Sequence, residues 1–400
     1  EINISTVASN EDTIYLRFFQ TASHYFWMID DITVVEGIAN QLSVEEAIST
    51  FGTQPNEGYY TMTPTALTQP LSFAALLRNE GGFTSRNPYL KVAVNYSVLG
   101  SVWEDSSVIG SNIIPQGSDI FNIATAYPNT DGRGQYLATY FAISDSINED
   151  TSRSMFTIPW AVTDTVFAKD FNVSSGNIGP ASYVGGDNDG SRIGTKYTLN
   201  QVARVTSLSF FISTSTTNVG AEMKAQVWGF DTTQATLNDM INVPNIKAQN
   251  PLPYVIQAAD LGSWLTISMF PPVTLPAGQY VVVAEQSGGN SNGSELYLGR
   301  DRDAEKLQPF GRDFVSMVYT NDANPAWGNI FAQPMMRMNF GFPKSIDDIS
   351  ATIKEFTISP NPNNGQFTLV VAADQANFQL NVRNVVGQVV YNEAITVNNT

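Results

Sequence analysis

Apolar and polar residues alternate in short runs along most of this chain. Because successive side chains of a β-strand point to opposite faces of a sheet, a period of two predicts strands that are buried on one side. The runs are rich in β-branched and aromatic residues, and clusters of Gly, Pro, Asn and Asp, which favour turns, separate them. The clearest predicted strands are Leu71–Leu77, Leu90–Val98, Gln135–Ser144, Val205–Ser213, Ala221–Phe230, Trp264–Phe270 and Gln279–Glu285.

Helical periodicity is rare in the sequence. One short helix is predicted over Val44–Phe51, with Ser43 as its N-cap and Glu46, three residues further on, as the partner in a capping box. The predicted fold class is therefore all-β, built of tandem β-sandwiches of Ig-like and jelly-roll-like type.

Two turn-rich stretches mark the predicted domain boundaries. The strand pattern lapses over Val173–Pro180 and again over Phe340–Ser345, where small and turn-forming residues gather. The first residues of the chain read as two strands whose partners would lie upstream. The predicted segments, in chain order, are the last strands of a truncated jelly-roll domain over residues 1–37, an Ig-like β-sandwich over 38–172, a jelly-roll-like β-sandwich over 173–342, a linker over 343–355 and the start of a small domain over 356–400.

Composition and charge exclude several classes of function. The 400-residue chain is 42% hydrophobic and 11% aromatic, which is enough apolar material for several cores. Its formal net charge is −17 and it has no run of Lys or Arg, so we expect no nucleic-acid partner and no attraction to an anionic membrane surface. Without Cys there is no zinc-thiolate site or thiol nucleophile, and the single histidine, His24, rules out a histidine cluster. No apolar stretch is long enough to span a bilayer.

The most specific motif lies near the C-terminus. Two prolines and an Asn-Asn-Gly turn precede one strand, and a second hydrophobic strand leads into Gly-Gln-x-Val. This arrangement resembles the type A C-terminal sorting domain of the type IX secretion system of Bacteroidota. The family pattern continues to a closing strand that this sequence lacks, so we expect a truncated, Ig-like sorting domain. The residues that carry the resemblance are Pro360, Asn361, Pro362, Gly365 and Gly387.

This resemblance implies a route of export and a set of partners. Proteins with such a domain cross the outer membrane through the type IX translocon, and a β-barrel shuttle protein recognises the sorting domain. The resemblance therefore implies an extracellular or cell-surface location for the chain.

Two further patterns are typical of secreted proteins of the same phylum. The run Ile29-Asp30-Asp31-Ile32, which follows an aromatic pair, resembles the terminal strand of MAM-like jelly rolls. The acceptor pattern for Bacteroidota O-glycosylation, Asp followed by Ser or Thr and then an aliphatic residue or Thr, occurs four times. We therefore predict O-glycans at some of Thr13, Ser146, Thr165 and Thr232.

One loop has the composition of a calcium site. Asp187, Asn188 and Asp189 stand between glycines, and carboxylate and amide oxygens are the ligands that Ca²⁺ prefers. The alternative is an ordinary Asp-Asn-Asp-Gly turn, because these residues tolerate left-handed backbone conformations. No other cofactor is predicted.

Two tryptophans are candidates for contact with a ligand. Trp103 and Trp327 stand in polar or turn-rich surroundings, which favours exposure and stacking on a sugar ring, whereas Trp228 and Trp264 lie in strands with the pattern of core residues. A Gly-x-Ser-x-Gly pattern at 289–293 is interpreted as a hairpin loop, because a strand follows it where a nucleophile elbow needs a helix.

Taken together, these patterns favour a secreted, multi-domain β-sandwich protein of the cell surface, with an adhesin-like, binding or structural role and surface polysaccharide as a candidate ligand. We expect no enzymatic activity in this chain. The alternative is that these sandwiches are the accessory C-terminal region of a secreted peptidase or glycosidase whose catalytic domain lies upstream, since fold alone does not define function.

Overall fold

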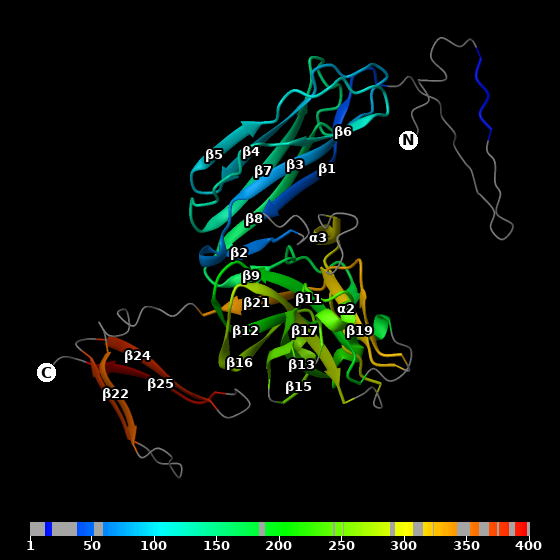
Figure 1. Cartoon of the computed structure of the whole chain (residues 1–400). Coiled ribbons are helices and arrows are strands. Elements are labelled where there is room, and N and C mark those ends of the chain that lie inside the picture. The colour runs from blue at the N-terminus through cyan, green and yellow to red at the C-terminus, as the bar shows by residue number, and fades with distance from the viewer. Residues whose placement is uncertain are drawn as a thin grey trace. The chain divides into compact units, whose positions relative to one another are not determined.

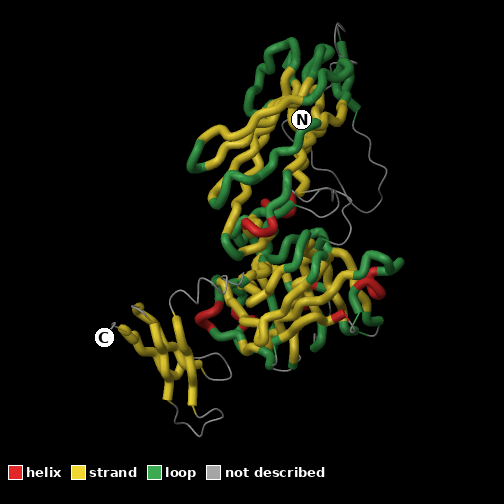
Figure 2. The backbone as a smooth tube through the Cα atoms, turned by 60° about the vertical axis from the view of Figure 1, so that its left-hand side comes forward, coloured by secondary structure: helices red, strands yellow, loops and turns green. Residues whose placement is uncertain are grey.

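The alternation of the sequence appears directly in the burial of strand β3 (Leu71–Asn79), where buried and partly exposed residues alternate without interruption. The computed structural model describes residues 13–17, 38–51, 59–183, 189–242, 245–250, 252–288, 293–306, 315–322, 324–341, 353–359, 368–373, 376–383 and 389–397. The chain forms two compact units, Glu1–Phe340 and Gly341–Thr400. The predicted all-β fold class with several sandwich-like domains is confirmed, and Figure 2 shows strands throughout with only short helical turns among the described residues.

The first sandwich occupies the upper part of the first unit in Figure 1. A three-stranded sheet packs against a second sheet through aromatic contacts such as Phe73 with Tyr140, whose ring centroids are 5.9 Å apart. In order across each sheet, the strands are β1 (Leu42–Phe51), β3 and β6 (Ser118–Asn122) in the first, and β2 (Met62–Pro64), β8 (Met155–Thr163), β7 (Gly134–Ile143), β4 (Tyr89–Tyr96) and β5 (Gly100–Ser106) in the second.

The second sandwich packs a seven-stranded sheet against a four-stranded part of another. The seven-stranded sheet contains β14 (Ile246–Gln249), β13 (Glu222–Phe230), β17 (Gly278–Ser287), β11 (Arg192–Leu199), β19 (Ser316–Thr320) and β20 (Ala326–Asn329), with β15 (Tyr254–Val255) paired to β13. The opposing strands are β16 (Trp264–Leu275), β12 (Ala203–Phe211), β21 (Met336–Phe340) and β9 (Val166–Ala168).

Short elements complete the described part of the chain. Strands β10 (Asn177–Ile178) and β18 (Leu298–Gly299) form a small separate ladder. The helical turns are α2 (Leu237–Met240), α3 (Arg302–Lys306), η1 (Thr65–Leu67), η2 (Pro180–Ser182), η3 (Thr216–Asn218) and η5 (Ala258–Asp260). In the C-terminal unit, β22 (Ile353–Ser359) pairs with β23 (Thr368–Ala373), and β24 (Ala376–Arg383) pairs with β25 (Val389–Val397).

One sheet runs through both sandwiches of the first unit. Strand β9 of the second sandwich pairs with β2 of the first, so nine strands from β16 to β5 form a single hydrogen-bonded sheet. The amide of Thr61 donates to the carbonyl of Ala168, and the ring of Tyr60 stacks on Phe167 at 4.4 Å between centroids. The amide of Thr198 donates to the Tyr60 hydroxyl at 2.9 Å. The two sandwiches are therefore joined by backbone and aromatic contacts and not by a free linker.

The predicted strands are confirmed and the predicted helix is wrong. Each of the seven clearest predicted strands corresponds to an observed strand with boundaries that differ by a few residues. Residues 44–51 form part of strand β1, which pairs antiparallel with β3 along its whole length. The register shifts between Val44 and Glu46, which marks a β-bulge. Side chains on either side of a bulge do not keep a period of two, so the sequence here lacks the alternation that predicts a strand.

Candidate functional site

The sorting-motif residues Pro360, Asn361, Pro362, Gly365 and Gly387 lie outside the described residues. The strands on either side of the first four are described. Ser359 pairs with Thr368, so β22 and β23 form a hairpin whose connection carries the two prolines. The prediction of a sorting domain stays a prediction.

The proposed calcium loop is described only at its end. Asp187 and Asn188 lie outside the described residues. The Asp189 carboxylate accepts a hydrogen bond from the amide of Gly288 at 2.8 Å, and its backbone carbonyl accepts one from the Asn321 side chain at 2.8 Å. The described residues hold no group of three or more His, Cys, Asp or Glu side chains arranged around a common ion. The calcium prediction therefore stays untested.

The tryptophans differ from the expectation in two places. Trp327 is only 7% exposed, because its indole packs edge-on against Trp228 in a core cluster on the seven-stranded sheet, so the expected exposure is wrong. Trp103 is partly buried and lies 5.4 Å from the ring of Phe73. Trp228 is buried as predicted, whereas Trp264, expected in the core, is partly exposed. The sequence around Trp264 does not indicate its exposure, because alternation along a strand shows that the two faces differ but not which face is covered by another layer.

The predicted glycosylation sites are accessible to different degrees. Thr13, Thr165 and Thr232 are exposed, and Ser146 is partly buried. Glycosylation at these positions stays a prediction. His24 and residues 289–292 of the Gly-x-Ser-x-Gly pattern lie outside the described residues.

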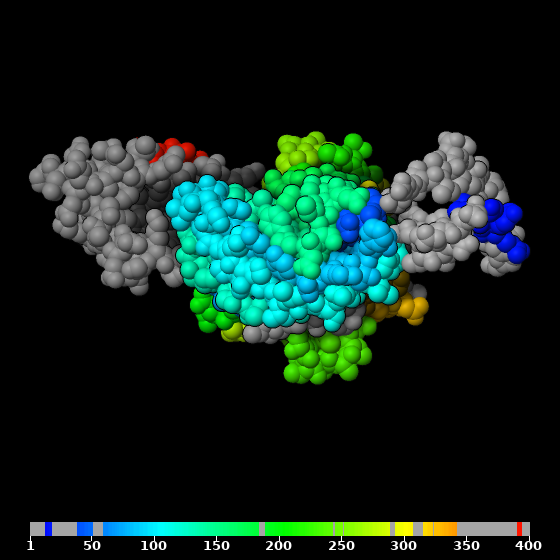
Figure 3. Space-filling view, turned by 90° about the horizontal axis from the view of Figure 1, so that it is seen from above, coloured from blue at the N-terminus to red at the C-terminus, as the bar shows by residue number. Residues whose placement is uncertain are grey.

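The most elaborate loop cluster lies at one end of the first sandwich. Leu42 pairs with Asn79, Tyr89 with Ile143, and Phe141 with Met155, so the segments beyond these pairs gather at the same end. We call this cluster the loop end; it comprises residues 38–41, 80–88, 107–117 and 144–154. Figure 3 views the first sandwich from this end. Loops at the ends of a sandwich carry binding functions in many proteins because a rigid scaffold positions them.

Hydrogen bonds between side chains and backbone hold two segments of the loop end together. The carboxylate of Glu149 accepts bonds from the amides of Ala39 and Asn40 at 3.0 and 2.9 Å. The Asn148 side chain accepts from the amide of Leu42 at 2.7 Å, and Gln41, which is buried, exchanges two bonds with the backbone of residue 150. The loop 144–154 is thus fixed to residues 38–42 before any partner arrives.

A second set of bonds converges on residues 85–88. Ser85 forms a bridge with Ile113, and the amide of Gly110 donates to the carbonyl of Pro88. The amide of Asp145 donates to the carbonyl of residue 86, while its carboxylate accepts from the Asn87 side chain at 2.7 Å. The loops 107–117 and 144–154 are therefore both tied to the same short segment.

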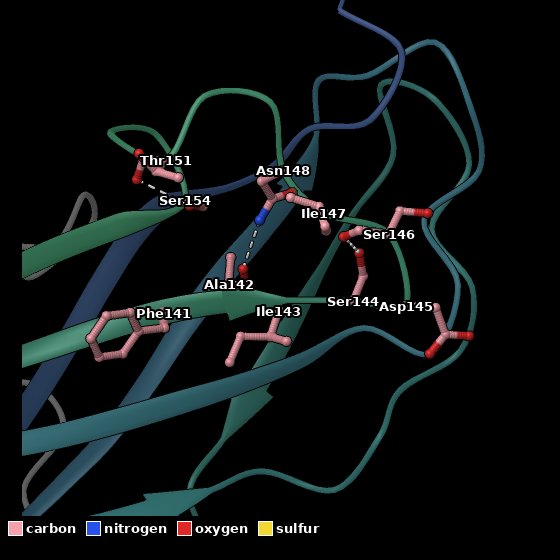
Figure 4. A pocket seen from close by; sticks show the side chains of 10 residues that line it. All are labelled: Phe141, Ala142, Ile143, Ser144, Asp145, Ser146, Ile147, Asn148, Thr151 and Ser154. Carbon is pink, nitrogen blue, oxygen red and sulfur yellow. Dashed lines mark hydrogen bonds between the residues drawn. The ribbon is translucent and has the colours of Figure 1, made fainter.

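A pocket of about 300 Å³ opens beside the last of these loops (Figure 4). In that view, Asn148 reaches across to donate to the carbonyl of Ala142 at 2.9 Å, and the Ser144 hydroxyl donates to the carbonyl of Ser146 at 3.1 Å. Nearby, the hydroxyl and amide of Ser152 hold the pKa of the Asp150 carboxyl below its usual value, so Asp150 is ionised at neutral pH. The pocket is lined by Phe141, Ala142, Ile143, Ser144, Asp145, Ser146, Ile147, Asn148, Thr151 and Ser154.

Large apolar side chains project from this fixed framework into solvent. Their exposed fractions range from 63% to 89%, and they come from three of the loops of the loop end. Exposed apolar groups that are gathered in one region mark sites of association. We call these residues the apolar tips; they are Phe83, Val108, Ile109, Ile114 and Ile147.

Comparisons with known proteins give distant structural likeness alone. No family model and no curated protein matches the chain. A CARDB domain from Pyrococcus furiosus, crystallised in complex with di-metal ions, is similar over 34% of this chain and 100% of its own length, with 9% identity and a TM-score of 0.22. A two-domain protein of unknown function from Bacteroides fragilis is similar over 64% of this chain and 95% of its own, with 8% identity and a TM-score of 0.16. Among the described residues, no helix is both long and apolar enough to cross a membrane.

Proposed function

We propose that this chain is a secreted, cell-surface β-sandwich protein with an adhesin-like role, and that its loop end contacts the surface to which it attaches. The observation that carries the proposal is the set of apolar tips on a framework fixed by Glu149, Asn148 and Gln41. A preorganised surface loses little conformational entropy when it binds, so apolar contacts there contribute to affinity efficiently.

The joined sandwiches support this role mechanically. A sheet that continues from β16 to β5 holds the loop end at a fixed orientation to the second sandwich. An attachment protein benefits from such a joint, because a partner bound at one end then acts on the whole unit.

The binding part of the proposal is tested with the full chain immobilised on beads. Attachment to intact cells of a Bacteroidota strain with a type IX system is compared between the natural chain and the double variant Phe83→Ser, Ile114→Ser. The matched control is Val202→Ser, Leu252→Ser, which replaces two apolar residues, each 64% exposed, on the second sandwich. We expect attachment to fall several-fold for the loop-end variant alone. Equal attachment of all three proteins would contradict the role of the loop end.

We further propose that type IX secretion exports the chain through its C-terminal unit. Residues 341–400 form a compact unit distinct from the rest, as a removable sorting module requires, and the two prolines lie on the β22–β23 connection. The chain is expressed in a type IX-competent host and in a strain without the translocon, and protein at the cell surface is measured. We expect surface protein to depend on the translocon and to be lost in Pro360→Ala, Pro362→Ala, but not in Pro253→Ala. Export that is independent of the translocon would overturn this part.

A further inference from the structure

A second surface with the chemistry of a binding site lies on the second sandwich, far along the chain from the loop end. Strands β16, β12 and β21 lie side by side in Figure 1, and their pairing fixes which residues share a face. Leu208, Ile267 and Met338 are buried toward the sandwich core. Because side chains alternate along a strand, their neighbours in sequence face outward.

The outward residues form rows of small polar groups. Ser209 pairs with Thr266 on one side and Arg337 on the other, and Ser207 pairs in the same way with Ser268 and Asn339. These side chains are hydroxyls and an amide, apart from the arginine. Each hydroxyl and amide both donates and accepts hydrogen bonds.

Hydrogen bonds fix the orientation of this polar group. The Asn339 amide nitrogen donates to the hydroxyls of Ser207 and Ser209 at 3.1 and 2.8 Å, and the Ser209 hydroxyl is bonded to that of Thr266 at 2.8 Å. Since its amide nitrogen is engaged on the sheet, the carbonyl oxygen of Asn339 is turned away from these two hydroxyls. Thr266 and Ser268 are exposed and Asn339 is partly exposed, whereas Ser209 is buried and supports the two exposed hydroxyl rows from within the sheet.

An aromatic ring stands at one end of the rows. The guanidinium of Arg337 lies 3.8 Å from the centroid of the Trp264 ring, and the indole nitrogen donates to the side chain of Asn172 at 2.7 Å. The Arg337 side chain is only 12% exposed, and Trp264 is partly exposed. One face of the indole thus covers the guanidinium, and the ring of Phe211 packs against the indole with centroids 5.6 Å apart and planes 78° apart. These contacts and the bond to Asn172 hold the indole in place and leave part of it exposed.

A second ring stands at the other end. Phe270 lies two residues beyond Ser268 on β16, where the register against β12 shifts between Ser268 and Val273, and it is 85% exposed. The backbone of an extended strand advances by roughly 20 Å over the six-residue step from Trp264 to Phe270. The surface is therefore long enough for several sugar rings in a row.

We propose that this surface, which we call the β16 face and which consists of Trp264, Thr266, Ser268, Phe270 and Asn339, binds a neutral oligosaccharide. Flat apolar rings stack on the CH-rich faces of pyranoses, and hydroxyl and amide side chains between them exchange hydrogen bonds with sugar hydroxyls. This inference deepens the adhesin-like function proposed above by naming a ligand class, but it concerns a different surface and binding to it needs no export.

Charge favours a neutral ligand over an acidic one. Asp170 pairs with Arg337, the charged residue in the rows, and so balances its charge. The whole chain carries a formal net charge of −17, which repels polyanions at ordinary salt. A polysaccharide with carboxylate or sulfate groups would find no unbalanced positive charge at Arg337 and would be repelled by the negative charge of the chain.

The test is binding of the purified full chain to an array of neutral and acidic glycans, followed by titration with the best neutral oligosaccharide. We expect binding to neutral glycans only, and about tenfold weaker binding for Trp264→Ala, because a tenfold change corresponds to the loss of roughly one good aromatic contact. The double variant Thr266→Val, Ser268→Ala keeps the aromatic rings and the side-chain size, and it should also weaken binding. It decides the question if Trp264→Ala proves unstable.

The control is Val202→Ser, Leu252→Ser, which replaces two exposed apolar residues outside the β16 face and should bind glycans like the natural chain. Failure to bind any neutral glycan, or equal binding by the natural chain and the β16-face variants, would overturn the inference. The bead assay tests the loop end and the glycan titration tests the β16 face. A negative result in one assay therefore does not decide the other.

Discussion

The Arg337 guanidinium donates two hydrogen bonds to the carboxylate of Asp170, one from Nε at 3.0 Å and one from Nη2 at 2.5 Å. The two residues are 167 positions apart in the sequence, and Asp170 is completely buried. Asp170 lies just beyond β9, the strand that links the two sandwiches through its pairing with β2. A bidentate pair of this kind is directional, so it fixes β21 against the segment that joins the sandwiches.

Removal of the guanidinium is expected to destabilise the first unit strongly. In Arg337→Met, the Asp170 carboxylate remains buried without its cationic partner, and breaking a buried pair in this way costs roughly 3–5 kcal/mol. The free energy of unfolding is measured by urea denaturation of the full chain. The matched control is Arg133→Met, whose partner is Asp164 in a pair that is 65% and 64% exposed; such exposed pairs contribute about 0–1 kcal/mol. Equal effects of the two variants would contradict the structural role of Asp170.

Much of the fold can be predicted from the sequence, because a strand that is buried on one face of its sheet has alternating apolar and polar residues. The alternation predicts strands over Leu71–Leu77 and Ala221–Phe230, and the structure has β3 and β13 at these places. Alternation does not indicate a strand where a bulge interrupts it, as between Val44 and Glu46 in β1. There, antiparallel pairing with β3 overrides a local capping pattern, because tertiary contacts outweigh weak helical preferences.

The candidate sites are less accessible to prediction from sequence. A tryptophan in a turn-rich stretch, Trp327, is buried because α2 and β13 cover it, and both belong to segments far away in the sequence. Trp264 has the local pattern of a core residue, but it lies on β16 at the edge of the sheet and faces outward. Which face of a strand is covered depends on the other layer, and a single strand carries no information about that layer.

Buried tyrosines make the stability of the first unit sensitive to alkaline pH. Burial raises the pKa of Tyr136 from 10.0 to about 12, and it also raises the pKa values of Tyr140 and Tyr197. The folded pKa lies above the unfolded one, so these groups stabilise the fold fully below pH 10, and this contribution is lost as the pH rises from about 10 towards 12.

We therefore expect the urea midpoint to be lower at about pH 11 than at about pH 8, with the change setting in near pH 10, together with delayed appearance of tyrosinate absorbance in the folded protein. Tyr136→Phe removes one such group and should reduce the fall, whereas Tyr15→Phe, at an exposed position, should not. A pH-independent midpoint over this range would show that these tyrosines ionise alike in the folded and unfolded states.

A buried asparagine is expected to hold a loop of the second sandwich. Asn218 is fully buried, its amide nitrogen donates to the carbonyls of Ser213 and Tyr297, and its side-chain oxygen accepts from the amide of Tyr297 at 2.7 Å. Asn218→Ala leaves these backbone groups without their partner, which costs about 1–3 kcal/mol for a buried group. Urea denaturation measures the loss. Asn242→Ala, which removes an exposed side chain with one bond to Asp239, is the control and should change stability by less than about 0.5 kcal/mol.

A single glycine is expected to determine whether the loop end keeps its framework. A Cβ atom at Gly81 would lie 2.6 Å from the amide nitrogen of Gln41 and 2.7 Å from the carbonyl oxygen of Ala39, and both of these are backbone atoms with little freedom to move. Gly81→Ala should therefore push residues 80–83 away from residues 38–41 and cost roughly 1–3 kcal/mol.

Hydrogen exchange followed by mass spectrometry locates this effect. We expect faster exchange in 38–42 and 80–88 of Gly81→Ala, because the amides of Gly82 and Phe83 lose their carbonyl acceptors at Ile38 and Ala39. Gly328→Ala is the control, since a Cβ there meets no atom within 4 Å. If the framework positions the apolar tips, bead attachment should fall in Gly81→Ala although every tip residue is retained. Unchanged attachment together with faster exchange would show that the tips act without a fixed framework.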